Sequence, residues 1–314
     1  MKSEVRAQWL SVFDYFFILR PMLFYPGWST LLAGYLIHTK SRWFYLTDLS
    51  SDVWTLISTF AILMGGAFIL NQLRDAESDR VNKKLFMISD GIVPKHIAVI
   101  ESIILVLTAL IIGFIFNLIV GIVFLFFFII TGILYNYKPA NLKDRPWGSL
   151  FANAAMGWLA FAAGWCAHSE LSAALFIDSL PYLFFNTALY LFTMLPDIDG
   201  DKKIYKKTLA VLYGPKKMIL AAFLLYLMGF MVTIFLADYL ALFFYVCSSP
   251  FFLLSIFSFK IEAAIRTTKF GILFFAVAIC LRWPLYFPIM LAGFLFTKLY
   301  YKARFNFNYP RFAA

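Results

Sequence analysis

Three polar side chains recur every four residues at the end of a long apolar stretch: Asn71, Asp75 and Asp79. If the helix that starts near Val53 continues through them, all three point along one helix face, one turn apart. One amide and two carboxylates on a face without a basic residue supply the oxygen ligands that Mg²⁺ prefers and shares with substrate phosphates. The spacing therefore predicts a divalent-cation site, and residues 71–79 are called motif one below.

A second acidic stretch repeats this pattern later in the chain. Asp197 and Asp201 are four residues apart with Asp199 between them, and they also follow a long apolar segment. We call residues 197–201 motif two. Carboxylates at the edge of a membrane are costly, and their default interpretation is functional. A single Asp-x-x-x-Asp spacing is also common in solvated loops, but two such motifs on two spans predict a magnesium–diphosphate site.

The composition indicates a membrane protein. The 314 residues are 62% hydrophobic, 20% aromatic and only 14% charged, whereas soluble domains have about 25% charged residues. Apolar runs of about 20 residues recur, which is long enough to cross a bilayer as helices. We expect an all-α polytopic protein of the inner or plasma membrane, with one integral-membrane domain over residues 1–314. The net charge of +10 follows from basic loops and does not indicate nucleic-acid binding.

The apolar segments predict nine membrane spans. Their approximate ranges are 13–38, 53–73, 97–116, 118–135, 149–168, 173–195, 218–237, 240–259 and 270–300. Arg282, Trp283 and Pro284 interrupt the last range. Because proline kinks or ends a helix, this range forms either one kinked span or two short ones.

The distribution of basic residues predicts the orientation in the membrane. Lys and Arg are concentrated in the loops after spans two, four, six and eight, whereas the loops after the odd-numbered spans hold only Lys40 and Arg42. The positive-inside rule then puts both motifs and the N-terminus in the cytoplasm. A count of nine spans would put the C-terminal basic residues on the opposite side: Lys298, Lys302, Arg304 and Arg311.

Four carboxylates, those of Asp75, Asp79, Asp197 and Asp201, are the candidate catalytic groups. Mg²⁺ held by these motifs would neutralise a diphosphate leaving group. Lys and Arg side chains from neighbouring loops would clamp the remaining phosphate oxygens. Loss of an allylic diphosphate leaves a carbocation, which aromatic faces stabilise by cation–π attraction. The apolar interior of a helix bundle would then hold the hydrocarbon tail.

Motif one, together with Arg80, Asn82 and Lys83, resembles the signature of the UbiA superfamily of intramembrane prenyltransferases. Motif two, preceded by Pro196 and followed by Lys207, Thr208 and Gly214, resembles the second signature of that superfamily. Further similarities are Arg20, Pro21, Tyr135, Gly148 and the stretch 142–146.

The resemblance implies nine transmembrane helices around a central cavity, capped by cytoplasmic loops that carry the motifs. It also implies Mg²⁺-dependent transfer of a prenyl group from an isoprenyl diphosphate to a hydrophobic acceptor in the membrane lipid. By motif position, Asn71, Asp75 and Asp79 would bind one Mg²⁺, and Asp197 and Asp201 the other. The candidate diphosphate-binding residues are Arg20, Lys83, Lys143, Arg145 and Lys202.

The chain departs from the family pattern after motif one. Phe86 stands where the family usually has Arg, and Asp90 stands where it usually has Ser before Gly91. An expected phosphate-binding cation is therefore missing. Lys84 is a candidate substitute, although an ammonium lacks the two-pronged hydrogen-bonding geometry of a guanidinium. Near motif two, Lys206 stands where the family often has Gly.

Three functions remain distinct at this point. The first is a prenyltransferase of isoprenoid biosynthesis, whose acceptor is an aromatic ring, a glycerol-lipid or sugar-phosphate hydroxyl, or a polyene. The second is a terpene cyclase, which uses the same ionisation without an external acceptor. The third is a cation-coupled transporter, which would need carboxylates near the middle of the membrane rather than at the ends of spans.

Overall fold

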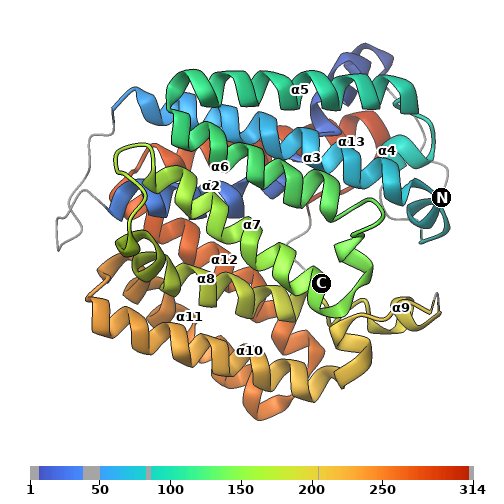
Figure 1. Ribbon diagram of the computed structural model, residues 1–314. Coiled ribbons are helices and arrows are strands. Elements are labelled where there is room, and N and C mark those ends of the chain that lie inside the picture. The colour runs from blue at the N-terminus through green and yellow to red at the C-terminus, as the bar shows by residue number, and fades with distance from the viewer. Residues whose placement is uncertain (1–6, 38–49, 83–85, 204, 311–314) are drawn as a thin grey trace. The chain divides into compact units, whose positions relative to one another are not determined.

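The computed structural model describes residues 7–37, 50–82, 86–203 and 205–310. Within these ranges every regular element is a helix or a helical turn (Figure 1). Among the described residues, six helices are long and apolar enough to cross a membrane: those at Asp52–Glu77, Lys95–Phe116, Ala173–Thr193, Leu209–Leu236, Tyr239–Ser258 and Ile261–Arg282. The chain is thus an all-α integral membrane protein, as its composition predicts. The count of nine spans stays a prediction.

The contacts within the chain define two compact units, and the prediction of one domain over residues 1–314 stays a prediction. Unit 1 comprises residues 1–28, 50–132 and 285–314, and unit 2 comprises residues 29–49 and 133–284. Motif one belongs to unit 1 and motif two to unit 2.

In unit 1, the first expected span is broken into short pieces. These are the turn η1 (Gln8–Phe13), helix α1 (Asp14–Phe17), the turn η2 (Pro21–Leu23) and helix α2 (Phe24–Leu36), which continues into unit 2. Arg20 lies at the break with φ 58° and ψ 59°. Pro21 explains the break, because proline cannot donate a helical hydrogen bond and it disfavours the α conformation of the residue before it.

The long helices of unit 1 pack closely. They are α3 (Asp52–Asn82), α5 (Lys95–Phe116) and α6 (Leu118–Phe128), which passes into a π turn at Ile129–Leu134. Helices α3 and α5 lie side by side (Figure 1), and the Ser102 hydroxyl donates to the Gly66 carbonyl across them at 2.8 Å. A methyl group at Gly66 would press against Val106. The small residue thus permits this close approach.

The last apolar region of the chain forms two full-length helices, α12 (Ile261–Arg282) in unit 2 and α13 (Tyr286–Phe305) in unit 1. The break at Trp283 and Pro284 therefore separates two helices instead of kinking one. The C-terminal end of α13 packs on the short helix α4 (Phe86–Ser89), which follows motif one. Lys302 and Arg304 thus lie at the motif-one end of unit 1, whereas nine spans would put them on the opposite side of the membrane from the motifs.

Unit 2 contains the remaining helices: α7 (Pro146–Trp165), α8 (Ala173–Thr193), α9 (Ile198–Lys203), α10 (Leu209–Leu236), α11 (Tyr239–Ser258) and α12. Helix α8 packs against α7, α10 and α12, and α11 packs against α12. Helix α10 begins at Leu209, earlier than the predicted start near residue 218. It is broken at Gly214, which has φ 76° and precedes Pro215. Glycine adopts this φ without strain, so the break follows from the Gly-Pro pair.

The core of unit 2 is built from aromatic side chains and one very close helix crossing. Phe185 contacts Phe244 and Tyr245 with ring centroids 4.5 and 5.1 Å apart. A Cβ atom at Gly34 would overlap the Phe161 carbonyl, and one at Gly164 would overlap the Leu31 carbonyl. The two glycines therefore let the backbones of α2 and α7 touch.

Candidate functional site

Motif one lies on a single uninterrupted helix, α3, so the predicted face exists. Asn71 and Asp75 are half-buried, and Asp79 is buried with 9% of its surface exposed. Between them, the Gln72 side chain donates to the Ile18 carbonyl at 2.7 Å. This bond ties motif one to the break that precedes Arg20. The helix thus supplies two carboxylates and one amide oxygen from one side.

Arg20 is brought to motif one from a distant part of the sequence. Its guanidinium is attracted electrostatically by the carboxylates of Asp75 and Asp79. The Nε atom of Arg20 is buried and has no hydrogen-bond partner among the residues that the structure describes. A buried donor without a partner is costly, so this atom is suited to an acceptor that arrives with a ligand.

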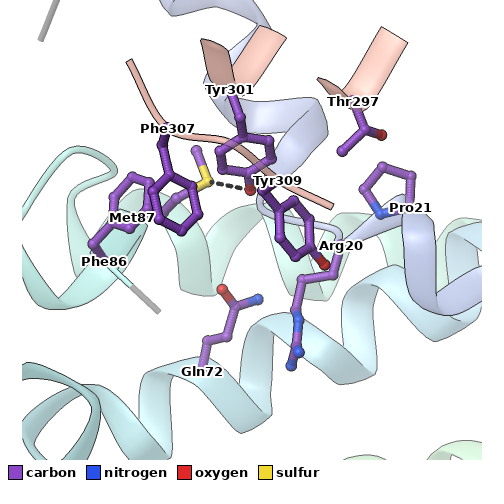
Figure 2. Close-up of a pocket in the computed structure, with 9 residues that line it drawn as sticks. All are labelled: Arg20, Pro21, Gln72, Phe86, Met87, Thr297, Tyr301, Phe307 and Tyr309. Carbon is purple, nitrogen blue, oxygen red and sulfur yellow. Dashed lines mark hydrogen bonds between the residues drawn. The ribbon is translucent and has the colours of Figure 1, made fainter. Parts of the chain in front are cut away.

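A cavity of about 150 Å³ in unit 1 adjoins Arg20 (Figure 2). It is lined by Arg20, Pro21, Gln72, Phe86, Met87, Thr297, Tyr301, Phe307 and Tyr309. In the close-up, the Arg20 side chain extends toward the helix that carries Gln72, and the Tyr301 hydroxyl contacts the Met87 sulfur. The cavity therefore has one cationic side chain and several hydroxyl groups within mostly apolar walls.

Phe86, which replaces the family's usual Arg, is a packing residue. Its ring contacts Phe305 at 5.0 Å, Phe307 at 5.9 Å and Tyr301 at 6.2 Å between centroids, all edge to face. Such pairs add about 0.5–1.5 kcal/mol each beyond burial. With Phe at position 86, the family's phosphate-binding cation is absent, and the C-terminal end of the chain packs against the Phe86 ring instead.

Motif two is more exposed than motif one. Asp197 precedes helix α9 and is exposed, whereas Asp201 lies in α9 and is half-buried. The Asp201 amide donates to the Asp197 carbonyl at 2.8 Å, and the Lys206 amide donates to the Asp201 carbonyl at 2.9 Å. These bonds fold the motif into one compact turn.

The loop before α7 lies next to motif two. The Lys206 ammonium is 3.9 Å from the Oδ1 atom of Asp144. The Oδ2 atom of Asp144 accepts a hydrogen bond from the Asn141 side-chain amide at 2.7 Å. Because this ion pair is long and partly exposed, its contribution to stability is small. It does explain Lys206 at a position where the family often has Gly, and it links the loop of Lys143 and Arg145 to motif two.

The predicted site residues therefore fall into two groups. In unit 1 the structure brings Arg20 into electrostatic interaction with Asp75 and Asp79, on the helix that also carries Asn71. In unit 2 it brings the loop with Lys143 and Arg145 near the loop with Asp197, Asp201 and Lys202. The Arg145 guanidinium donates to the Pro139 carbonyl at 2.9 Å within its own loop, and Lys202 is exposed. Lys83 and Lys84 lie outside the described residues.

The donor chemistry of motif one suits Mg²⁺. No group of three or more His, Cys, Asp or Glu side chains in the described part of the chain is arranged to hold a metal ion by itself. Mg²⁺ is usually bound by one or two carboxylates and completes its shell with waters and substrate phosphates. Asp75, Asp79 and the Asn71 amide provide such an incomplete set, so they fit a metal that is shared with a ligand.

Gln72 and the C-terminal aromatic residues belong to the site, but no sequence pattern predicts them there. Gln72 lies within motif one, yet nothing in its spacing indicates a bond to Ile18. Tyr301 and Tyr309 join Arg20 from more than 280 positions away. Burial raises the pKa of Tyr309, and the Arg20 charge partly offsets this rise. The Tyr309 hydroxyl therefore stays protonated at neutral pH and can donate a hydrogen bond.

The sequence pattern of the UbiA prenyltransferase family matches residues 27–268. A digeranylgeranylglyceryl phosphate synthase of Methanosphaera stadtmanae is 29% identical over 164 residues, which are 52% of this chain and 58% of that protein. A Sulfolobus acidocaldarius protein of the same name is 28% identical over 183 residues, or 58% and 63% of the two chains. The matched regions thus span about three fifths of these relatives.

The fold is also that of a solved structure. A UbiA homolog from Archaeoglobus fulgidus, bound to GPP and Mg²⁺, superposes with a TM-score of 0.66 at 19% identity. The superposition covers 85% of this chain and 99% of that one. The similarity indicated by the two motifs is therefore confirmed at the level of sequence family and fold.

Proposed function

This chain belongs to the UbiA prenyltransferase family, and we propose that it transfers a prenyl group from an isoprenyl diphosphate to a lipophilic acceptor, with Mg²⁺ as cofactor. The observation that carries the proposal is the arrangement on α3. Asn71, Asp75 and Asp79 present oxygen ligands on one face, and the half-buried Arg20 interacts with the two carboxylates. Metal ligands next to a guanidinium are what a metal-bound diphosphate requires.

Each motif has a separate task in this proposal. Asn71, Asp75 and Asp79 hold one Mg²⁺, and Asp197 and Asp201 hold a second. When bound, Mg²⁺ supplies positive charge that offsets the charge of the departing diphosphate. Arg20 donates to a phosphate oxygen through its fork of N–H groups. Lys143, Arg145 and Lys202 are the candidates for the remaining phosphate contacts.

The acceptor in this proposal is a glycerol-phosphate type of lipid. The names of the two curated relatives support this class, because both are digeranylgeranylglyceryl phosphate synthases. The solved homologue bound to GPP and Mg²⁺ supports the donor and the metal. An orientation with both motifs in the cytoplasm follows from the positive-inside rule.

Turnover of labelled geranyl, farnesyl and geranylgeranyl diphosphates by the purified protein tests the proposal. The assay is run with and without Mg²⁺, and with and without a membrane-lipid extract. Asp75→Ala and Asp197→Ala are compared with Asp52→Ala, which lies exposed at the other end of α3. We expect donor consumption that needs Mg²⁺, both motif aspartates and the extract, and that Asp52→Ala leaves unchanged.

Two other results would change the conclusion. Consumption of donor without the extract would identify a terpene cyclase. An absence of both donor binding and donor consumption in the unaltered protein would contradict the diphosphate chemistry altogether.

A further inference from the structure

The C-terminal end of the chain is fastened to the segment that carries Arg20. Two bonds join Arg304, in the last turn of α13, to Asp14 in α1: Nη2 donates to Oδ2 at 2.8 Å and Nε to Oδ1 at 3.1 Å. Both side chains are buried, with 6% and 5% of their surface exposed. Such a two-pronged buried pair fixes orientation as well as distance. The Asp14–Arg304 pair thus fixes the position of α13 along helix α1, which precedes Arg20.

The residues after α13 are held over the same cavity by aromatic contacts. Tyr309 contacts Tyr301 with ring centroids 5.0 Å apart, and Phe307 contacts Phe86 at 5.9 Å. Phe86 is the position where the family's Arg is absent. The side chain that replaces the missing cation therefore helps to place Tyr309 beside Arg20.

Two donors in this cavity have no acceptor among the residues that the structure describes. The Arg20 Nε is buried without a partner there. The half-buried Tyr309 lines the same cavity, and its hydroxyl makes no hydrogen bond to a residue in the described ranges. The other polar groups are engaged: the Gln72 amide donates to Ile18 and Tyr301 contacts the Met87 sulfur. Tyr309 also interacts electrostatically with Arg20. A buried cationic donor without a partner, next to a hydroxyl that can donate, suits an anionic oxygen ligand.

We propose that Tyr309, carried by the C-terminal segment, binds a phosphate group of the substrate together with Arg20 and thereby compensates for the absence of a cation at position 86. The cavity of about 150 Å³ is roughly ten times the space that one buried water needs, so a phosphate group fits. The inference rests on the proposed function. The phosphate comes either from the donor diphosphate or from a phosphate on the acceptor, and the test separates these sources.

The test uses the full-length protein with Tyr309→Phe, which keeps the ring and removes only the hydroxyl. Tyr15→Phe is the matched control, because Tyr15 is 42% exposed on α1 and does not line the cavity. One arm measures binding of geranylgeranyl S-thiolodiphosphate, an unreactive donor analogue, in the presence of Mg²⁺. The other arm compares KM for geranylgeranylglyceryl phosphate with KM for geranylgeranylglycerol.

We expect Tyr309→Phe either to weaken binding of the donor analogue or to raise the KM for the phosphorylated acceptor, in each case about tenfold. This is the effect of losing one hydrogen bond to a charged group. Weaker binding of the analogue assigns the contact to the donor. A raised KM for the phosphorylated acceptor, with KM for the alcohol unchanged, assigns it to the acceptor. The melting temperature and the Tyr15→Phe control should stay at the value of the unaltered protein.

The inference is wrong if both arms are unchanged in Tyr309→Phe, or if only kcat falls while both affinities are retained. That result would leave the proposed function intact, provided that the unaltered protein binds and consumes donor. An unaltered protein that neither binds nor consumes donor would instead refute the proposed function, and the inference with it.

Discussion

At the scale of single residues, Arg20 shows how local backbone strain serves the site. Its left-handed conformation, with φ 58°, costs an L-residue about 1–2 kcal/mol. Such a conformation persists only where the surroundings enforce it. Here Pro21 follows directly, and Gln72 holds the carbonyl of Ile18 just before the break. The strained conformation directs a guanidinium at motif one.

Replacing Arg20 by lysine should therefore affect ligand binding more than folding. Lysine keeps the charge but loses the fork of donors that matches phosphate oxygens. We expect Arg20→Lys to raise the KM for donor roughly tenfold, with little change in the melting temperature. Arg266→Lys is the control, because Arg266 is exposed on α12 in unit 2. Equal donor KM values for Arg20→Lys and the unaltered protein would rule out a bidentate role.

Asp75 allows a sharp test of metal binding, because a second acid lies two residues away on the same helix. Asp75→Asn keeps the size of the side chain and removes its charge, so we expect the Mg²⁺ concentration for half-maximal turnover to rise about tenfold or more. Glu77 is exposed and lies off the motif face, so Glu77→Gln should leave this concentration unchanged. A titration of turnover against Mg²⁺ measures both, and chelation by EDTA should abolish activity. Parallel shifts in the two variants would indicate a general loss of surface charge.

At the scale of elements, much of the architecture could be predicted from sequence patterns. The helix through motif one follows from its four-residue spacing. Most helix boundaries lie within a few residues of those predicted from the apolar segments. The break at Arg20, the break of α10 at Gly214 and the division of the last apolar region all lie next to prolines. Proline disturbs a helix locally because it cannot donate a backbone hydrogen bond. Whether it kinks, breaks or precedes the helix depends on packing neighbours that the sequence does not reveal.

The part of the site that could not be predicted depends on contacts between distant segments. The Asp14–Arg304 pair joins residues 290 positions apart, and Tyr309 reaches Arg20 from the opposite end of the chain. Neither pair has a spacing signal. The sequence marks Phe86 as a departure from the family, but only packing against Phe305 and Phe307 gives the departure a physical meaning.

The crossing of α2 and α7 yields a prediction at the scale of elements. Because a Cβ atom at Gly164 would overlap the Leu31 carbonyl, Gly164→Ala must push the two backbones apart. Overpacking of this kind costs about 1–3 kcal/mol, so the melting temperature in detergent should fall by several degrees. Gly157→Ala on the same helix is the control, since its Cβ would meet Asn186 at ordinary contact distances of 3.5 and 3.8 Å. Equal stability of the two variants would contradict the close crossing.

At the scale of the whole molecule, the ends of the helices decide which residues share a side of the membrane. Helix α8 has motif two directly after its C-terminal end and the loop that holds Glu170 before its N-terminal end. The C-terminal end of α13 lies at the motif-one end of unit 1, beside Phe86. Combined with the basic residues of the motif loops, this arrangement favours a cytoplasmic position for Lys202 and Asn306 and an external position for Glu170.

Single cysteines introduced at these three exposed positions test that topology. In a background with serine at Cys166, Cys247 and Cys280, a membrane-impermeant maleimide should label Glu170→Cys in intact cells. It should label Lys202→Cys and Asn306→Cys only in inside-out vesicles, because basic loops are retained in the cytoplasm. Labelling of Asn306→Cys from the same side as Glu170→Cys would separate the C-terminal segment from motif one. It would contradict both the packing of α13 on Phe86 and the phosphate-binding role of Tyr309. Activity retained in the cysteine-free background is the control, since a misfolded protein would react from both sides.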